Sequence, residues 1–411
     1  MQNSTGIGGF SLAKDEQVSS DFDHFHPVEI ENGTEHGKTH YFRPLSSSKN
    51  GPYSFEIQQD PDLMLSPKTM RLYGAMRIKL RETKDDGTEE EKNLPAGFNV
   101  STVNNVFHSL FSAVPIAING TIITDPSALW YAYKAYDEIT LSYSPSVKRK
   151  HFKQRGYIAD THSQFDTLGN GNKGYTERKD MFAESKWVYF GIKVHSDVCT
   201  IQNYLPVGQK LEIEFHRNPD DFVLLYPAVQ NKSCFIELKD LELGIRKASP
   251  AQSIRNYYNE KLNEGAKPSV PIDRSIIINY AVPAQTSDLS HYNLIRGTNC
   301  LPDQIIISMV KSSAWKGDHT QNPFNFQHFN VCEASLRVNG INEPERSYKL
   351  EPAGENKVRA YEEFLENVGV GTENRNIGID IDDYYGGYFF LAWDRSPDKC
   401  NRRHSCKQVL R

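Results

Sequence analysis

The chain has 411 residues, of which 38% are hydrophobic, 11% aromatic and 24% charged. These fractions are typical of a folded globular protein, and the length allows two or three domains with sizeable cores. With 47 basic and 52 acidic residues, the net charge of −5 lacks the basic excess of a dedicated nucleic-acid-binding protein. No apolar run approaches the roughly 20 residues of a membrane-spanning helix, and the first residues lack the pattern of a secretory signal peptide.

The first half of the chain predicts an arm followed by a β-rich domain. Residues 1–50 are polar, rich in Gly, Ser and His, and without periodicity, so we expect a flexible N-terminal arm. Apolar and basic residues then alternate between positions 71 and 81, which is typical of a strand with one buried face. Further strand patterns cover 188–194, 211–215, 222–226 and 235–245. We therefore expect one domain of about eight strands over residues 51–247.

Residues 116–124 predict a β-hairpin and the residues after it a helix. Asn119-Gly120 lies between two short apolar runs, and Asn-Gly favours the type I′ turn because both central residues need a positive φ. Asp125 and Pro126 then fit the N-cap and first position of a helix that carries Tyr133 and Tyr136 on one face.

The second half predicts a linker and a second β-rich domain. Residues 248–273 are expected to be a linker with a possible helix at 253–262, and residues 274–411 a second domain. Within that domain, strand patterns occupy 275–280, 304–310 and 388–393, and a helical pattern covers 358–368. The polar stretch 146–185 is expected to be a long loop, in which the basic run 148–155 is a solvated segment.

The most informative pattern is a repeat. Residues 107–120 and 327–340 both begin near a histidine, His108 or His328, and both end on Asn-Gly, Asn119-Gly120 or Asn339-Gly340. The histidines and the Asn-Gly pairs are each 220 residues apart. A tyrosine-bearing helical pattern follows each hairpin. The repeat therefore predicts that one β-rich domain occurs twice, and an antiparallel jelly roll suits such a domain because it pairs two sheets.

No constellation of residues indicates catalysis. Residues 169–174 match the glycine spacing of a dinucleotide-binding turn, but no strand pattern precedes them, so we predict a flexible loop. Cys400, His404 and Cys406 are possible zinc ligands, but their spacing fits no standard module and no fourth ligand lies nearby, so we predict no metal site. Most of the six cysteines are expected to be reduced core residues, and His108 and His328 to be hydrogen-bonded structural residues. No cofactor is expected.

Several motifs, in order along the chain, resemble the major capsid protein of Polinton (Maverick) elements and adintoviruses. The resemblance runs from about residue 51 to 394 and is carried by segments 104–120, 321–330, 358–361 and 384–394, together with the Tyr-Ala-Tyr helix. The motif residues to which the resemblance gives a structural role are Asn105, His108, Phe111, Asn119, Gly120, Tyr133, Asn322, Pro323, Phe324, Phe326, His328, Phe329, Asn339, Gly340 and Tyr361.

The resemblance implies a double jelly roll, an all-β fold of two tandem antiparallel jelly rolls with short helices in the inter-strand loops. It implies no enzyme activity. In that family, homotrimers form pseudo-hexameric capsomers of an icosahedral shell. The expected partners are the chain itself, neighbouring capsomers and a minor capsid or penton protein. We expect no membrane partner, and genome contact only through the N-terminal arm. The expected location is the virion, after intracellular assembly and without secretion.

In one respect the sequence departs from the family, which continues beyond the Asp394 region with further strands. We therefore expect the second jelly roll to lack C-terminal strands, and a domesticated or decayed genomic copy that no longer assembles is one alternative. A tandem jelly roll that binds a ligand or glycan is another. A cupin-like metal enzyme ranks last, because the strand patterns hold only isolated histidines such as His195 and His216.

Overall fold

The structure is a computed structural model, and it describes residues 33–46, 50–85, 87–124, 130–291, 302–350, 357–370 and 376–396. It also describes the backbone of three short strands, β1 (Gly6–Ile7), β2 (Phe10–Ser11) and β20 (Lys407–Leu410). Asp125, Pro126, Cys400, His404 and Cys406 lie outside these residues, so neither the predicted helix cap nor the possible zinc ligands can be placed.

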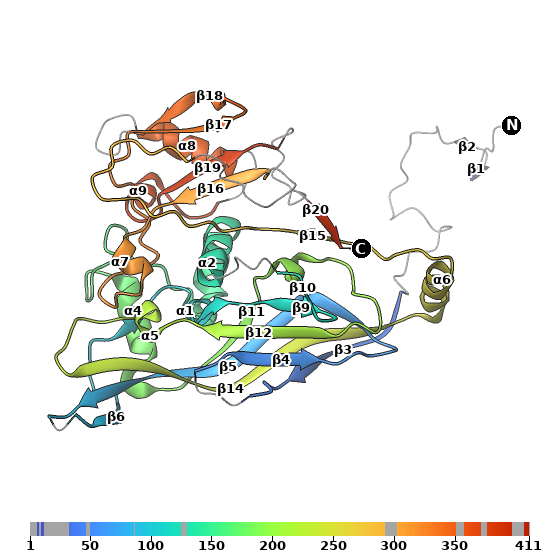
Figure 1. Cartoon of the computed structure of the whole chain (residues 1–411), viewed down its shortest axis with the longest axis horizontal. Coiled ribbons are helices and arrows are strands. Elements are labelled where there is room, and N and C mark those ends of the chain that lie inside the picture. The colour runs from blue at the N-terminus through green and yellow to red at the C-terminus, as the bar shows by residue number, and fades with distance from the viewer. Residues whose placement is uncertain are drawn as a thin grey trace.

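Two antiparallel sheets of five strands each make up the first half (Figure 1). One has the order β10-β9-β12-β4, with β8 also paired to β12, and the other has the order β11-β5-β14-β3, with β6 paired to β5. The strands of the first sheet are β4 (Tyr53–Ile57), β8 (Phe111–Ala113), β9 (Ile116–Ile118), β10 (Thr121–Ile122) and β12 (Leu211–Arg217). The strands of the second are β3 (Thr34–Phe42), β5 (Met64–Thr83), β6 (Glu89–Asn93), β11 (Val188–Lys193) and β14 (Lys232–Pro250).

The alternation predicted between positions 71 and 81 is confirmed in β5. Leu72, Met76, Ile78 and Leu80 are at most 2% exposed, whereas Arg71 lies on the solvent side of the same strand. The buried side chains pack against the other sheet, so the core of the first half lies between the two sheets.

Helices occupy the connections between strands. They are α1 (Val106–Ser109), α2 (Tyr131–Ser142), α3 (Pro145–Lys150), α4 (Lys173–Met181), α5 (Asp220–Val223) and α6 (Gln252–Asn263). A two-stranded sheet of β7 (Ser101–Thr102) and β13 (Leu224–Leu225) completes this half. Helix α6 confirms the helix predicted in the linker, and α2 confirms the tyrosine helix.

In the second half, the described strands pair in twos. β15 (Val270–Asp273) pairs with β20, β16 (Gln304–Ser308) with β19 (Phe390–Asp394), and β17 (Glu333–Val338) with β18 (Ile341–Lys349). Helices α7 (Ser312–Trp315), α8 (Val358–Asn367) and α9 (Ile381–Tyr385) connect them. In Figure 1 β16, β17, β18, β19, α8 and α9 lie on the side of α2 opposite to the large sheets, whereas α7 lies beside α2, next to α4. The strand ladders of both halves are antiparallel, which confirms the predicted all-β class.

Several predictions of single elements were wrong. Residues 34–42, expected within the arm, form β3, which pairs with β14 along its length. Residues 275–280 are not in a strand. Of the strand predicted at 222–226, only Leu224–Leu225 form one, β13, because residues 222 and 223 belong to α5. The stretch 146–185 contains α3 and α4 and is not one long loop.

Candidate functional site

The two Asn-Gly pairs form equivalent hairpins. Asn119 has a φ of 50° and Gly120 one of 77°, while Asn339 has 51° and Gly340 has 85°. In both cases the strands pair directly across the turn, β9 with β10 and β17 with β18. Positive φ values at both central residues are the requirement of a type I′ turn. The hairpin prediction is therefore confirmed in both halves.

The paired histidines lie in different surroundings. His108 is buried, and its Nδ1 lies 3.0 Å from the Tyr131 hydroxyl. His328 is partly exposed, and its Nδ1 accepts a hydrogen bond of 3.0 Å from the backbone N–H of Asn330. Burial is the main cause that lowers the pKa of both, strongly for His108. Each histidine thus has a local hydrogen-bond partner, and neither belongs to a metal-ligating group within the described residues.

Aromatic side chains join the two halves, and three of them are motif residues. Phe324 stacks on Tyr136 of α2 with 4.2 Å between the ring centroids and 8° between the planes. Tyr133, also on α2, stacks on Trp315 of α7 at 4.8 Å. Phe326 lies 5.9 Å from Tyr136. Both phenylalanines of the second-half motif therefore pack against the same side of α2. Stacked or edge-on aromatic pairs stabilise a fold by more than their buried area alone provides.

A buried polar cluster lies beside these rings, with Asp160 at its centre. Its Oδ1 accepts from Arg178 Nη2 at 2.5 Å and from Asn172 Nδ2 at 2.8 Å. Its Oδ2 accepts from Asn322 Nδ2 at 3.1 Å. Arg178, Asn172 and Asn322 are all fully buried. The carboxylate is therefore satisfied from both halves, because Asn322 belongs to the second-half motif and the other two lie in or next to α4.

Further polar contacts bring the same segments together. The backbone N–H of Asn322 donates to Asp166 Oδ1 at 2.8 Å, and Asn325 Nδ2 donates to Asp166 Oδ2 at 2.9 Å. The Lys148 ammonium, from α3, donates to the backbone carbonyl of Ile377 at 2.8 Å and also to that of Thr140. Burial lowers the pKa of Lys148 to about 7. We call this set of aromatic and polar contacts between the halves the junction.

Sequence reasoning found only part of the junction. The motif resemblance pointed to Tyr133, Asn322, Phe324 and Phe326. It did not point to Asp160, Arg178 or Asn172, which lie in the stretch predicted to be a loop. Asn172 was expected in a flexible glycine-rich turn, but its side chain caps α4 by accepting from the Tyr175 N–H, and the helix begins at the next residue. That expectation was wrong, and the N-cap preference of asparagine was the signal available in the sequence.

The remaining motif residues are distributed over both halves. Asn105 is buried, with a φ of 59°, and Phe111 is buried and packs edge-on to Phe215 at 5.0 Å. Tyr361 of α8 donates from its hydroxyl to the Ile379 carbonyl at 2.7 Å. Pro323 is buried next to Asn322, whereas Phe329 is 47% exposed. The structure thus gives packing roles to most of the motif.

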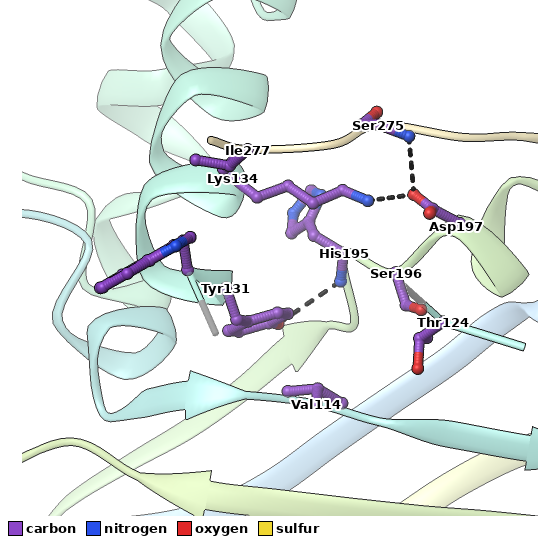
Figure 2. A pocket seen from close by; sticks show the side chains of 10 residues that line it. Val114, Thr124, Tyr131, Lys134, His195, Ser196, Asp197, Ser275 and Ile277 are labelled. Carbon is purple, nitrogen blue, oxygen red and sulfur yellow. Dashed lines mark hydrogen bonds and ion pairs between the residues drawn. The ribbon is translucent and has the colours of Figure 1, made fainter. Parts of the chain in front are cut away.

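A small cavity lies between α2 and the segment after β11 (Figure 2). Lys134 of α2 pairs with Asp197, which also accepts from the backbone N–H of Ser275 at 3.3 Å. His195 Nδ1 lies 2.9 Å from a carboxylate oxygen of Glu138. The cavity has a volume of about 30 Å³, close to the space that one water occupies in the liquid. Such a cavity does not accommodate an organic substrate.

A second cavity of about 240 Å³ lies next to the junction. Its lining includes Trp130, Tyr133, Phe222, Trp315 and Asn218. The volume is below the roughly 300 Å³ at which drug-sized ligand sites begin, but it suffices for a single ring. This cavity was not predicted, because its residues come from α2, α5 and α7, which are distant in the sequence.

Comparisons with known proteins give one sequence relative and several structural neighbours. No protein-family model matches the chain. Over 299 residues it is 22% identical to an uncharacterized protein of Caenorhabditis elegans, covering 72% of this chain and 68% of the relative. Within the described residues, no helix is both long and apolar enough to cross a bilayer.

Among solved structures, the crystal structure of the mavirus major capsid protein has a TM-score of 0.41 and 10% identity, over 97% of this chain and 88% of that one. The cryo-EM structure of the Sputnik virophage has a TM-score of 0.41 and 10% identity, over 61% and 55% of the two chains. The Faustovirus major capsid protein has a TM-score of 0.35 and 10% identity, over 60% and 59%. The chain thus spans less than two thirds of the last two structures.

Proposed function

We propose that this chain is a structural capsid protein, whose homotrimers form pseudo-hexameric capsomers in the icosahedral shell of a Polinton-like virus or transposon. Its partners would be further copies of itself, neighbouring capsomers and a minor capsid or penton protein, and its location the virion. No cofactor is part of this proposal. The motif resemblance suggests the family, and the antiparallel fold with its two equivalent hairpins supports the duplication that such a subunit requires.

The observation that carries the proposal is the junction. When a two-domain chain assembles around a threefold axis, it presents six similar units only if the two halves keep a fixed relative orientation. Here Asn322 donates to Asp160 and Phe324 stacks on Tyr136, so polar and aromatic contacts fix the same pair of segments. Because both contacts use motif residues, the motif supports the orientation of the halves rather than a catalytic site.

The direct test is the mass of the purified chain in solution. We expect size-exclusion chromatography with light scattering to give a particle of three times the 46.8 kDa chain mass, and electron microscopy to show six-lobed particles. The control is a variant with Phe324→Ala, in which loss of the stacked ring loosens the orientation of the halves and reduces the trimer fraction. A monomer that persists at high protein concentration would contradict the proposal and favour a copy that no longer assembles.

The second candidate function is that of a tandem jelly roll that binds a glycan. The cavity beside the junction favours it, because Trp130, Trp315 and Tyr133 offer aromatic faces and Asn218 an amide. A glycan array distinguishes the two candidates. Specific retention of a saccharide that is lost in a Trp315→Ala variant would support this function, and an empty array would leave the capsid proposal as the better one.

A further inference from the structure

The outward face of the β11-β5-β14-β3 sheet carries tyrosine rings above glycines. Tyr73 on β5 is the register partner of Gly191 on β11, and a Cβ atom added at Gly191 would come within 2.9 Å of the Tyr73 ring. A Cβ atom at Gly244 on β14 would lie 3.2 Å from both Tyr41 and Tyr73. The absence of side chains at the two glycines therefore lets the rings rest against the sheet, as in other cases where an aromatic ring covers a strand glycine.

Three tyrosines form a row on this face. Tyr41 on β3 and Tyr73 on β5 have ring centroids 5.9 Å apart. Tyr189 on β11 pairs with Ala75, two positions along β5 from Tyr73 and on the same face of the sheet. Tyr41 is 58% exposed and Tyr189 is 67% exposed. We call Tyr41, Tyr73 and Tyr189 the tyrosine row. More than half of Tyr41 and of Tyr189 is exposed to solvent, and the Lys239 ammonium lies 5.6 Å from the ring centroid of Tyr189.

Cations surround the tyrosine row. Arg71 and Lys193 are register partners across β5 and β11, and Arg246 follows Gly244 at the next outward position of β14. Within the described part of the chain, none of these three has an ion-pair partner. Arg155 adds positive charge near Arg71: burial is the main cause that lowers the pKa of Arg155, and the charge of Arg71 lowers it further. Glu242 on β14 is the register partner of Tyr73, and its carboxylate lies 3.6 Å from Arg43.

The cations at the other end of the same face are neutralised. Arg77 pairs with Glu237 at 2.7 Å, and Arg81 lies 3.3 Å from Glu89. Trp187 at that end lies under Arg77 and Lys239, each 4.4 Å from its ring centroid. The cations without carboxylate partners are therefore concentrated around the tyrosine row. Figure 1 shows β5 and β14 along the lower border of the molecule, away from the second half.

We propose that this face binds single-stranded nucleic acid, with bases stacked on the tyrosine row and phosphates held by Arg71, Lys193 and Arg246. Aromatic platforms beside positive side chains are the general mode of binding single strands without sequence preference. Three cations without carboxylate partners among the described residues favour a ligand with phosphates. A protein interface, in which Tyr and Arg are also enriched, is an outcome that the test distinguishes. The net charge of −5 does not oppose the proposal, since the acidic residues of this face lie mainly at its other end.

The test is fluorescence anisotropy of a labelled oligothymidylate of about 15 nucleotides, titrated with the full chain between about 50 and 200 mM NaCl. We expect binding that weakens with salt. Arg71→Gln and Lys193→Gln should each reduce the logarithmic salt slope by about 0.7. Tyr189→Ala should weaken binding by roughly tenfold at fixed salt. All three side chains face solvent, and thermal melting of each variant verifies that it folds.

Helix α6 provides matched controls, because Tyr257 is 60% exposed and Lys261 lies 5.9 Å from its ring centroid. Tyr257→Ala and Lys261→Gln should leave binding unchanged. No anisotropy change at low salt would overturn the proposal, as would equal losses in the α6 variants. If Tyr189→Ala changes the particle mass in light scattering and not oligonucleotide binding, the face is an interface between subunits and the proposal is wrong.

Discussion

The strongest single test of the buried polar cluster around Asp160 is the substitution Arg178→Met, because all the partners of Arg178 lie in the first half. The Arg178 side chain is fully buried, and its guanidinium donates to Asp160 at 2.5 Å, to the Thr102 carbonyl at 2.7 Å and to the Ile158 carbonyl. Methionine fills much of the same space but provides no donor. The substitution therefore leaves a buried carboxylate without its cation and removes one donor from each of two backbone carbonyls.

Removal of one member of a buried ion pair costs about 3–5 kcal/mol. Since whole domains are stable by about 5–15 kcal/mol, this loss is a large fraction of the total. Guanidinium unfolding followed by tryptophan fluorescence measures it, and the stacked Trp130 and Trp315 at 4.1 Å report on the region beside the junction. The midpoint of unfolding should fall markedly, with little change in the slope.

Two further variants test whether the buried ion pair is the cause of this loss of stability. Arg359→Met removes a partly exposed pair with Glu363 on α8, and it should cost about 0.5 kcal/mol or less. The double variant Asp160→Asn with Arg178→Met removes the buried charge as well, so it should be more stable than Arg178→Met alone. If Arg178→Met costs no more than Arg359→Met, or if the double variant is less stable than the single one, the buried pair does not stabilise the first half.

The other predictions concern the stacked ring, the hairpin and the buried lysine. Phe324→Ala should cost about 3–5 kcal/mol in the same unfolding assay, and Phe324→Leu clearly less. Gly340→Ala should cost about 1 kcal/mol because of its φ of 85°, whereas Gly169→Ala, at a position with open space, should have no effect on the melting temperature. Burial lowers the pKa of Lys148 to about 7, far below its unfolded value of about 10.4, so the unfolded chain binds the extra proton between these pH values. Stability should therefore rise by up to about 4 kcal/mol from pH 7 to pH 10, and a Lys148→Met variant that keeps the same rise would contradict this cause.

Local patterns of the sequence predicted both hairpins and the helices α2, α6 and α8, but not α3, α4 or α5. An Asn-Gly pair between two short apolar runs is enough to predict a type I′ turn, and both turns form as predicted. Helices α2 and α8 also follow from spacing alone. Strand β3 was missed because its side chains are mostly exposed, so the sequence Thr34–Phe42 shows no alternation of buried residues.

The failures of prediction concern long-range contacts. The apolar run at 275–280 suits a strand, but a strand requires a hydrogen-bonding partner, which a local pattern does not report. Likewise, Asp160 and Asn322 are 162 residues apart. An aspartate in a polar stretch of sequence gives no sign that its carboxylate is buried and accepts a hydrogen bond from a distant residue. The resemblance to capsid proteins identified Asn322 as a motif residue, and only the structure supplied its partner.

The separation of 162 residues between Asp160 and Asn322 has a consequence for synthesis of the chain. At the usual translation rate of about 5–20 residues per second, Asn322 emerges from the ribosome roughly 10 to 30 s after Asp160. During that interval the first half can form its sheets, but Tyr136 lacks its stacking partner and Asp160 lacks one of its donors. A nascent chain therefore exposes the aromatic side of α2 to solvent. We expect chaperones to bind α2 until residues 322–326 have been synthesised and pack against it.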